Sequence, residues 1–313
     1  MVAACRYLCY PGKLKGAAMY YLDDTTLGVW IDLPKKMVLT PEFFEWFADE
    51  LQFDLMSIMI DNADPVVAFS WSEKDVETAL RLADPYAIEI GLTTWPYPVA
   101  GLLRRMEQKM DALLAVGPVS EWETDQEFNW QEGSVNGFAD LDAAGDELVA
   151  IKKRLCEKYG CRNTITTFTY HRENSSRSDT APHADRAMIQ AYAIDERDGK
   201  PITYNHRFGP GRMQTLTLDR ALQIPGVKEK KVELGVGHAA WAQEGFTEKR
   251  VINEALGKSV LLSVPEAAMR ISFEAALPYE PVAHNWWSAK YIYPKSPKYL
   301  HYAFSFLRSL RAP

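Results

Sequence analysis

Four carboxylates lie close together between Pro118 and Glu127, where the sequence reads PVSEWETDQE. The stretch begins like a β-strand, and strand side chains alternate between faces, so Glu121 and Glu123 should point the same way. Two carboxylates on one face repel each other, which a fold tolerates poorly unless the pair is used. Such a pair suits general acid/base chemistry, in which one carboxyl stays protonated beside an ionised neighbour. A solvated edge strand followed by an acidic loop is the structural alternative.

Composition limits the classes of protein that fit. The chain has 313 residues, of which 47% are hydrophobic, so it can bury a large core, and single barrels reach this length. The net charge of −7 argues against a nucleic-acid partner. No apolar run of about 18 residues occurs, so no membrane insertion is expected. The N-terminal region has no apolar signal-peptide core, which predicts cytoplasmic synthesis without a signal peptide.

Motifs for cofactors and nucleophiles are missing from the sequence. Cys5, Cys9, Cys156 and Cys161 have no standard zinc spacing, so we expect free, reduced thiols and no metal. No glycine-rich dinucleotide fingerprint follows the first predicted strand, and no Walker loop occurs. A Gly-x-Ser-x-Gly elbow is also missing, which disfavours Ser-His-Asp chemistry. We therefore expect no cofactor.

Strand-like and helical runs alternate along the chain. Strands are predicted at residues 27–32, 55–60, 87–92, the acidic stretch, 164–170, 187–193, 238–243 and 270–275. Helices are predicted over residues 40–51, 72–83, 99–116, 141–159, 247–256 and 299–310, the first two opening at the N-caps Thr40 and Ser72. Eight strands alternating with helices indicate parallel pairing.

The simplest closure of this pattern is an α/β fold of the (β/α)8 TIM-barrel type, with a doubly wound open sheet as the alternative. We expect a single domain: an N-terminal extension at residues 1–24, then a barrel catalytic domain at residues 25–313. An irregular insertion is predicted after strand six, within residues 195–233.

Active sites of such barrels lie at the carboxyl-terminal ends of the strands. Nearly every predicted strand brings a polar or aromatic residue to that end. The candidates are Asp32, Asp61, Glu89, Trp95, Glu121, Glu123, Asp125, Tyr170, Gln190, Tyr192, Trp241, Gln243 and Glu274. Each alone could be a capping or loop residue, but an acidic cleft lined with Trp and Tyr is typical of polysaccharide cleavage. The aromatic rings of Trp95, Tyr170, Tyr192 and Trp241 would stack on sugar faces.

These residues resemble the barrel glycoside hydrolases, and among them the family 25 lysozymes, in two segments. The first is Gly28-Val29-Trp30-Ile31-Asp32, and the second is Glu121-Trp122-Glu123, where that family usually has Asp at the first position. The resemblance implies hydrolysis of a polysaccharide, with peptidoglycan favoured. It also implies Glu123 as proton donor, Glu121 as second carboxylate and Asp32 as a supporting acid. A phage-type endolysin released to the cell wall through another protein's pore would fit it.

Two other functions stay open on the same barrel. One is a metal-dependent sugar isomerase or lyase, with a site built from Glu89, a fourth-strand Glu and His171. The other is a non-catalytic carbohydrate-binding barrel. Loss of activity with a chelator would indicate the first, and glycan affinity without turnover would indicate the second.

Overall fold

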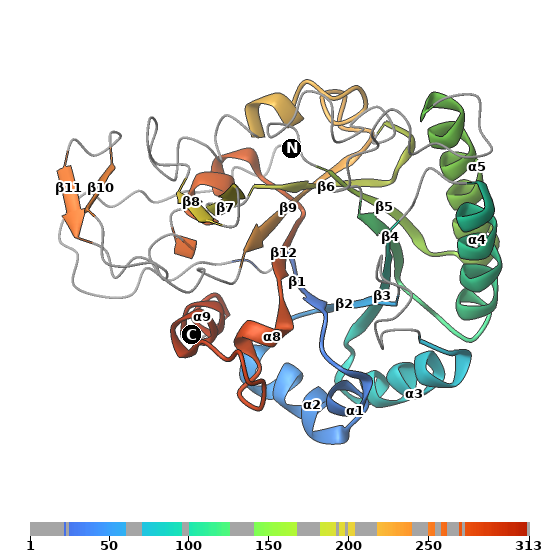
Figure 1. Cartoon of the computed structure of the whole chain (residues 1–313), viewed down its shortest axis with the longest axis horizontal. Helices are drawn as coiled ribbons and strands as arrows, with labels where there is room; N and C mark the ends of the chain where they lie inside the picture. Colours follow the sequence, from blue (N-terminus) through green and yellow to red (C-terminus); the bar gives the residue numbers. More distant parts are fainter. Residues whose placement is uncertain are drawn as a thin grey trace, which may run out of the picture.

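The computed structural model describes residues 22, 25–60, 71–95, 100–125, 141–167, 182–191, 194–197, 200–203, 218–239, 250–253, 258–261, 269–270 and 273–311. Eight strands form a closed barrel in the order β1-β12-β9-β6-β5-β4-β3-β2, and every neighbouring pair is parallel. Figure 1 shows this ring with helices packed around its outside. The predicted (β/α)8 barrel is confirmed, and the open sheet is excluded.

The first six barrel strands lie within a few residues of their predicted positions. They are β1 (Thr26–Ile31), β2 (Leu55–Met59), β3 (Glu89–Thr94), β4 (Glu121–Asp125), β5 (Arg162–Thr167) and β6 (Arg186–Gln190). The seventh, β9 (Glu233–Ala239), begins five residues before the predicted run that starts at His238. Short apolar runs bounded by polar residues are therefore a sound strand signal in most of this chain.

The eighth strand was predicted in the wrong place. It is β12 (Ala283–Trp287), whereas residues 269–270 and 273–276, within and beside the predicted run, are helical. Met269, Phe273 and Ala276 are buried at helical spacing, which explains the helix. β12 escaped notice because His284 and Asn285 are polar, although both are buried.

Side-chain caps fix the amino-terminal ends of two helices. Thr40 caps α2 (Pro41–Glu45), which continues as the π-helical turn η1 (Trp46–Leu51), and Ser72 and Asp75 form a capping box on α3 (Glu73–Ala83). Further helical segments are α1 (Lys35–Val38), η2 (Asp84–Tyr86), α4 (Ala100–Leu114), α5 (Leu141–Tyr159), η6 (Leu277–Tyr279), α8 (Ala289–Ile292) and α9 (His301–Arg308), besides short helical stretches such as residues 218–221. None of the helices in the described part of the chain is long and apolar enough to cross a membrane.

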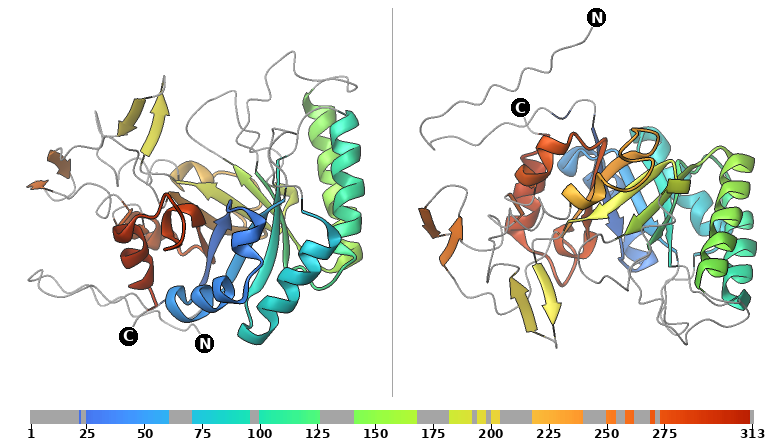
Figure 2. Two further views of the ribbon diagram at one scale, coloured as in Figure 1. Left: turned by 60° about the horizontal axis from the view of Figure 1, so that its bottom comes forward. Right: turned by 90° about the horizontal axis from the view of Figure 1, so that it is seen from above.

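Two antiparallel hairpins lie outside the barrel (Figure 2). β7 (Ile194–Arg197) pairs with β8 (Lys200–Thr203) after β6, at the start of the predicted insertion and one residue before its predicted boundary. β10 (Arg250–Asn253) pairs with β11 (Lys258–Leu261), so the helix predicted over residues 247–256 is wrong. Val251 and Ile252 face Val260 and Ser259 across this pair, and β-branched residues favour strands.

The main core lies between the barrel and its helices. Outward-facing strand residues such as Ile58, Leu92 and Trp122 pack in one cluster with apolar residues of α4 and α5. Cys156 and Cys161 are buried there as free thiols, as predicted, at the end of α5. Cys5 and Cys9 lie outside the described residues, as does nearly all of the predicted N-terminal extension.

The barrel closes between its first and last strands. β1 pairs with β2 on one side and with β12 on the other, with Gly28 opposite Asn285. A Cβ atom on Gly28 would lie only 2.3 Å from the Asn285 Oδ1 atom, so this seam has no room for a side chain. Arg311, after α9, ties this part of the chain to the segment before β1, since its guanidinium donates to the carbonyls of Leu22 and Thr25.

Candidate functional site

Three carboxylates of β4 point into the barrel. Strand alternation places Glu121, Glu123 and Asp125 on the inner face, while Trp122 and Thr124 face the helices. All three side chains are buried, and two of them have no exposed surface. Because all strands are parallel, Glu121 lies toward the amino-terminal end of the barrel, Glu123 halfway, and Asp125 at the carboxyl-terminal end. Buried charges are expensive, so such a column needs partners or a function.

Glu123 is held by donors from three other strands. Trp30 Nε1 of β1 donates to its Oε2 atom at 2.7 Å, and Thr93 Oγ1 of β3 donates to the same oxygen at 3.2 Å. The hydroxyl of Thr166 on β5 donates to Oε1. These contacts fix the carboxyl in the middle of the barrel.

Burial raises the pKa of the Glu123 carboxyl to about 7, and the charge of Glu121 adds to the rise. The hydrogen bonds from Thr166 and Trp30 and the charge of Lys152 act in the opposite direction. Near neutral pH the group can therefore both hold and release a proton, which is the property required of a general acid.

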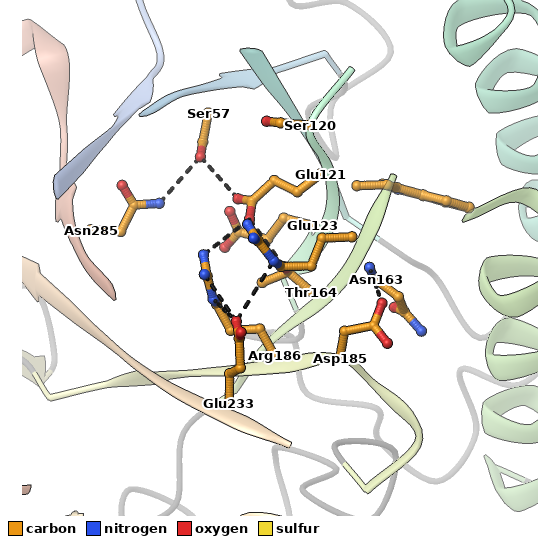
Figure 3. Close-up of polar contacts among 12 residues, drawn as sticks. Ser57, Ser120, Glu121, Glu123, Asn163, Thr164, Asp185, Arg186, Glu233 and Asn285 are labelled. Carbon is orange, nitrogen blue, oxygen red and sulfur yellow. Dashed lines mark hydrogen bonds and ion pairs between the residues drawn. The ribbon is translucent and has the colours of Figure 1, made fainter. Parts of the chain in front are cut away.

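Glu121 has a different environment, because it is the first residue of β4. Its carboxylate accepts from Thr164 Oγ1 at 3.1 Å and Ser57 Oγ at 3.4 Å, and pairs with Arg186 Nη1 at 3.5 Å. Arg186 also contacts Glu233, at the start of β9, at 3.0 Å (Figure 3). The prediction that Glu121 reaches the carboxyl-terminal rim is therefore wrong, because the strand begins at this residue.

Asp125 ends β4 and lies where Glu121 was expected. Gln190, at the end of β6, donates from Nε2 to Asp125 Oδ1 at 3.3 Å. The Oε1 atom of Gln190 is buried and has no hydrogen-bond partner among the described residues. Both residues were predicted to line the site, and the structure brings them together at the carboxyl-terminal end.

Asp32 and Trp95 also lie at the carboxyl-terminal end, as predicted, directly after β1 and β3. The Asp32 carboxylate pairs with Lys290 Nζ of α8 at 2.5 Å. This ion pair ties the end of β1 to the last βα unit, so Asp32 borders the site with its charge compensated.

Two predicted site residues lie elsewhere. Glu89 is the first residue of β3 and is exposed at the amino-terminal end, because the strand starts two residues later than predicted. Glu274 is exposed on a helical segment outside the barrel, because the eighth strand is β12. Five candidates, together with His171, lie outside the described residues: Asp61, Tyr170, Tyr192, Trp241 and Gln243.

The sequence reasoning missed Trp287, the last residue of β12. It shares the inward face with Asn285, is partly exposed, and its ring centroid lies 6.1 Å from that of Trp30. The peptide bond after it is cis. The adjacent pair Trp286-Trp287 was the available signal, but it fell outside the predicted strand.

The described residues contain no group of three His, Cys, Asp or Glu side chains that could hold a metal ion. The closest histidines, His238 and His284, lie 2.8 Å apart between Nε2 and Nδ1, and both rings are buried on the helix side of the barrel. Burial lowers the pKa of both, that of His284 to about 3, so the pair is uncharged at neutral pH. It is a packed structural pair beside Trp286.

No protein-family model and no curated protein matches this sequence. Solved structures do match. A GH113 β-1,4-mannanase complex is 10% identical, with 93% of this chain and 99% of that one covered and a TM-score of 0.55. The Group IV chitinase of Ostrinia furnacalis in complex with allosamidin is 9% identical, with 92% of this chain and 98% of that one covered and a TM-score of 0.57. The β-amylase catalytic domain of Paenibacillus polymyxa is 7% identical, with 94% of this chain and 99% of that one covered and a TM-score of 0.54. At these identities the likeness shows a shared fold alone.

Proposed function

We propose that this protein is a glycoside hydrolase that cleaves a polysaccharide by carboxylate acid/base catalysis. One observation carries the proposal: Glu123 is fully buried in the barrel, held by three donors, and its pKa is raised to about 7. The mannanase, chitinase and β-amylase of similar fold are all named for glycosidase activities, which supports the same class.

In the proposed reaction, Glu123 protonates the oxygen of the leaving sugar. Asp125 replaces Glu121 as the second carboxylate, because it shares the face of Glu123 and lies nearer the end at which barrel enzymes bind substrate. It would stabilise the developing positive charge on the sugar, or orient a water molecule. Same-face strand neighbours lie about 6.5–7 Å apart at the backbone. Carboxyl groups about 5–5.5 Å apart favour retention, and about 6.5–9.5 Å favours inversion.

The sugar itself would contact the aromatic and amide groups at this end. Trp287 offers a partly exposed ring against Trp30, which donates to Glu123, and the unpartnered Oε1 of Gln190 can accept a hydrogen bond from a sugar hydroxyl. We place Trp95 on the opposite side of the same mouth, after β3. Peptidoglycan stays the first substrate to test, because the two segments that resemble family 25 lysozymes include Glu123.

The test is cleavage of purified peptidoglycan, chitin, β-mannan, β-glucan and starch, followed by reducing-end assay and mass spectrometry. General acid catalysis contributes about 10²–10⁴-fold, so Glu123→Gln should lower kcat at least 10²-fold on the glycan that is cleaved. Asp125→Asn should also be severe, whereas Glu77→Gln, an exposed change on α3, should leave the rate unchanged.

Other outcomes would assign another function. Binding of a glycan without turnover would mean a non-catalytic carbohydrate-binding barrel. Sugar isomerisation that a chelator abolishes would mean a metal-dependent enzyme. Full activity of both Glu123→Gln and Asp125→Asn would refute the mechanism on β4.

A further inference from the structure

Lys152 is a lysine with no exposed surface, on the barrel-facing side of α5. Its Nζ atom donates to the carbonyl of Trp122 at 3.0 Å, to Thr124 Oγ1 at 3.0 Å and to the carbonyl of Thr164 at 2.5 Å. An ammonium group has three N–H donors, and three acceptors surround this one. The side chain is therefore built into the fold as a charged group behind β4 and β5.

All three acceptors are uncharged oxygens. Among the carboxylates, those of Glu123 and Glu121, across β4, favour the charged form of the ammonium. Two other basic side chains of α5 pair with carboxylates of α4, Arg154 with Glu107 and Lys158 with Asp111. Burying a lone cation is costly, so a position that keeps one demands an explanation.

We propose that Lys152 is a positioning residue for Glu123: it links β4 to β5 behind the carboxyl and places an ammonium group on the far side of the strand. The proposal rests on the function assigned above to Glu123. It adds a group that touches no substrate and lies outside the barrel.

The link between β4 and β5 follows from the hydrogen bonds of Lys152. Lys152 joins a carbonyl of β4 to a carbonyl of β5, and these two strands carry Glu123 and its donor Thr166. Thr164, which supplies one carbonyl, also donates its hydroxyl to Glu121. A slip between the strands would break the Thr166–Glu123 hydrogen bond, so Lys152 fixes the orientation of the carboxyl through its neighbours.

The electrostatic effect follows from burial. Inside a protein, charges interact more strongly than in water, and a positive charge favours the ionised form of a nearby carboxyl. Burial and Glu121 both favour the neutral form of Glu123, and the charge of Lys152 opposes them. A general acid works best with a pKa near the working pH, so this opposing charge keeps Glu123 from holding its proton too firmly.

The first experiment measures the Glu123 pKa directly, by NMR titration of protein with ¹³C-labelled glutamate carboxyls, assigned with Glu123→Gln. In Lys152→Met, which removes the charge but keeps the length, the pKa should rise by about one unit. Lys153→Met, the exposed neighbour on the same helix, should change nothing. An unchanged pKa in Lys152→Met would overturn the proposal. The titration needs no substrate, so its result is independent of whether the protein cleaves glycans.

A second experiment covers the case in which Lys152→Met does not fold. Coupling between two titrating groups is reciprocal, so Glu123→Gln should lower the pKa of Lys152, which burial already lowers to about 8, by the same amount. The lysine ¹³Cε resonance reports this value. No change in it would also overturn the proposal.

A cleaved glycan adds a third readout. Activity that needs protonated Glu123 falls as pH rises through its pKa, so Lys152→Met should move this basic limb upward by about one unit. A lower kcat with an unmoved limb would mean that Lys152 is only structural.

Discussion

Arg186→Met tests the buried ion pair at the amino-terminal end of the barrel. Arg186 is 2% exposed, and its partner Glu121 has no exposed surface. Removing one member of a buried pair typically costs about 3–5 kcal/mol, because the other charge is left uncompensated. Arg162, with Nη1 at 3.8 Å from Glu121, can compensate part of the charge. We therefore expect a loss of about 3 kcal/mol, the lower end of that range.

The assay is urea unfolding followed by circular dichroism, with the midpoint and slope compared between variants. Arg154→Met is the matched control, because it removes an arginine from an exposed pair with Glu107, and such pairs contribute about 0.2–1 kcal/mol. The double change Glu121→Leu with Arg186→Met should recover most of the loss, since apolar replacement of a buried pair is often neutral. If Arg186→Met is no more destabilising than Arg154→Met, the two side chains are not a desolvated pair.

Two further predictions concern titration. Glu121→Gln should lower the pKa of Glu123, because the substitution removes the negative charge that adds to the effect of burial. A ¹³C NMR titration of the Glu123 carboxyl measures this pKa, and an unchanged value would show that the two carboxyls do not interact. The His238–His284 pair should destabilise the protein in acid, because both histidines bind protons in the unfolded chain at about pH 6.5 but resist them when buried. Stability from the pair is thus present above that pH and lost below it, by about 2 kcal/mol per histidine at pH 5, so urea unfolding of His284→Phe should show a smaller drop between pH 7 and pH 5 than the unaltered protein.

Local patterns were enough to predict most of the barrel. The start of α2 is predicted by Thr40 as N-cap and Pro41 at the first helical position, and the start of α3 by Ser72 as N-cap. Short apolar runs predict the first six strands. Such signals depend on neighbours in the sequence, so they can be read without the fold. β12 could not be read this way, since His284 and Asn285 owe their burial to distant partners, His238 and Ser57.

The site could be predicted only in part, for a related reason. Alternation correctly places Glu121 and Glu123 on one face, but it does not say which residue reaches the carboxyl-terminal end. That depends on where β4 begins, and because it begins at Glu121, that residue lies at the amino-terminal end while Asp125 lies at the carboxyl-terminal end. Arg186 and Trp287 reach the interior from strands far along the chain, so no local spacing could join them to Glu123.

The seam between β1 and β12 has a consequence for synthesis. Thr26 pairs with Ala283, so the first strand of the barrel to be synthesised needs the last barrel strand as its neighbour. Until then β1 and β9 both have an unpaired edge, because β12 lies between them in the ring. Unpaired strand edges recruit other strands, and pairings this distant in sequence form slowly. The nascent chain is therefore most prone to aggregation until β12 has emerged and paired with both of these edges.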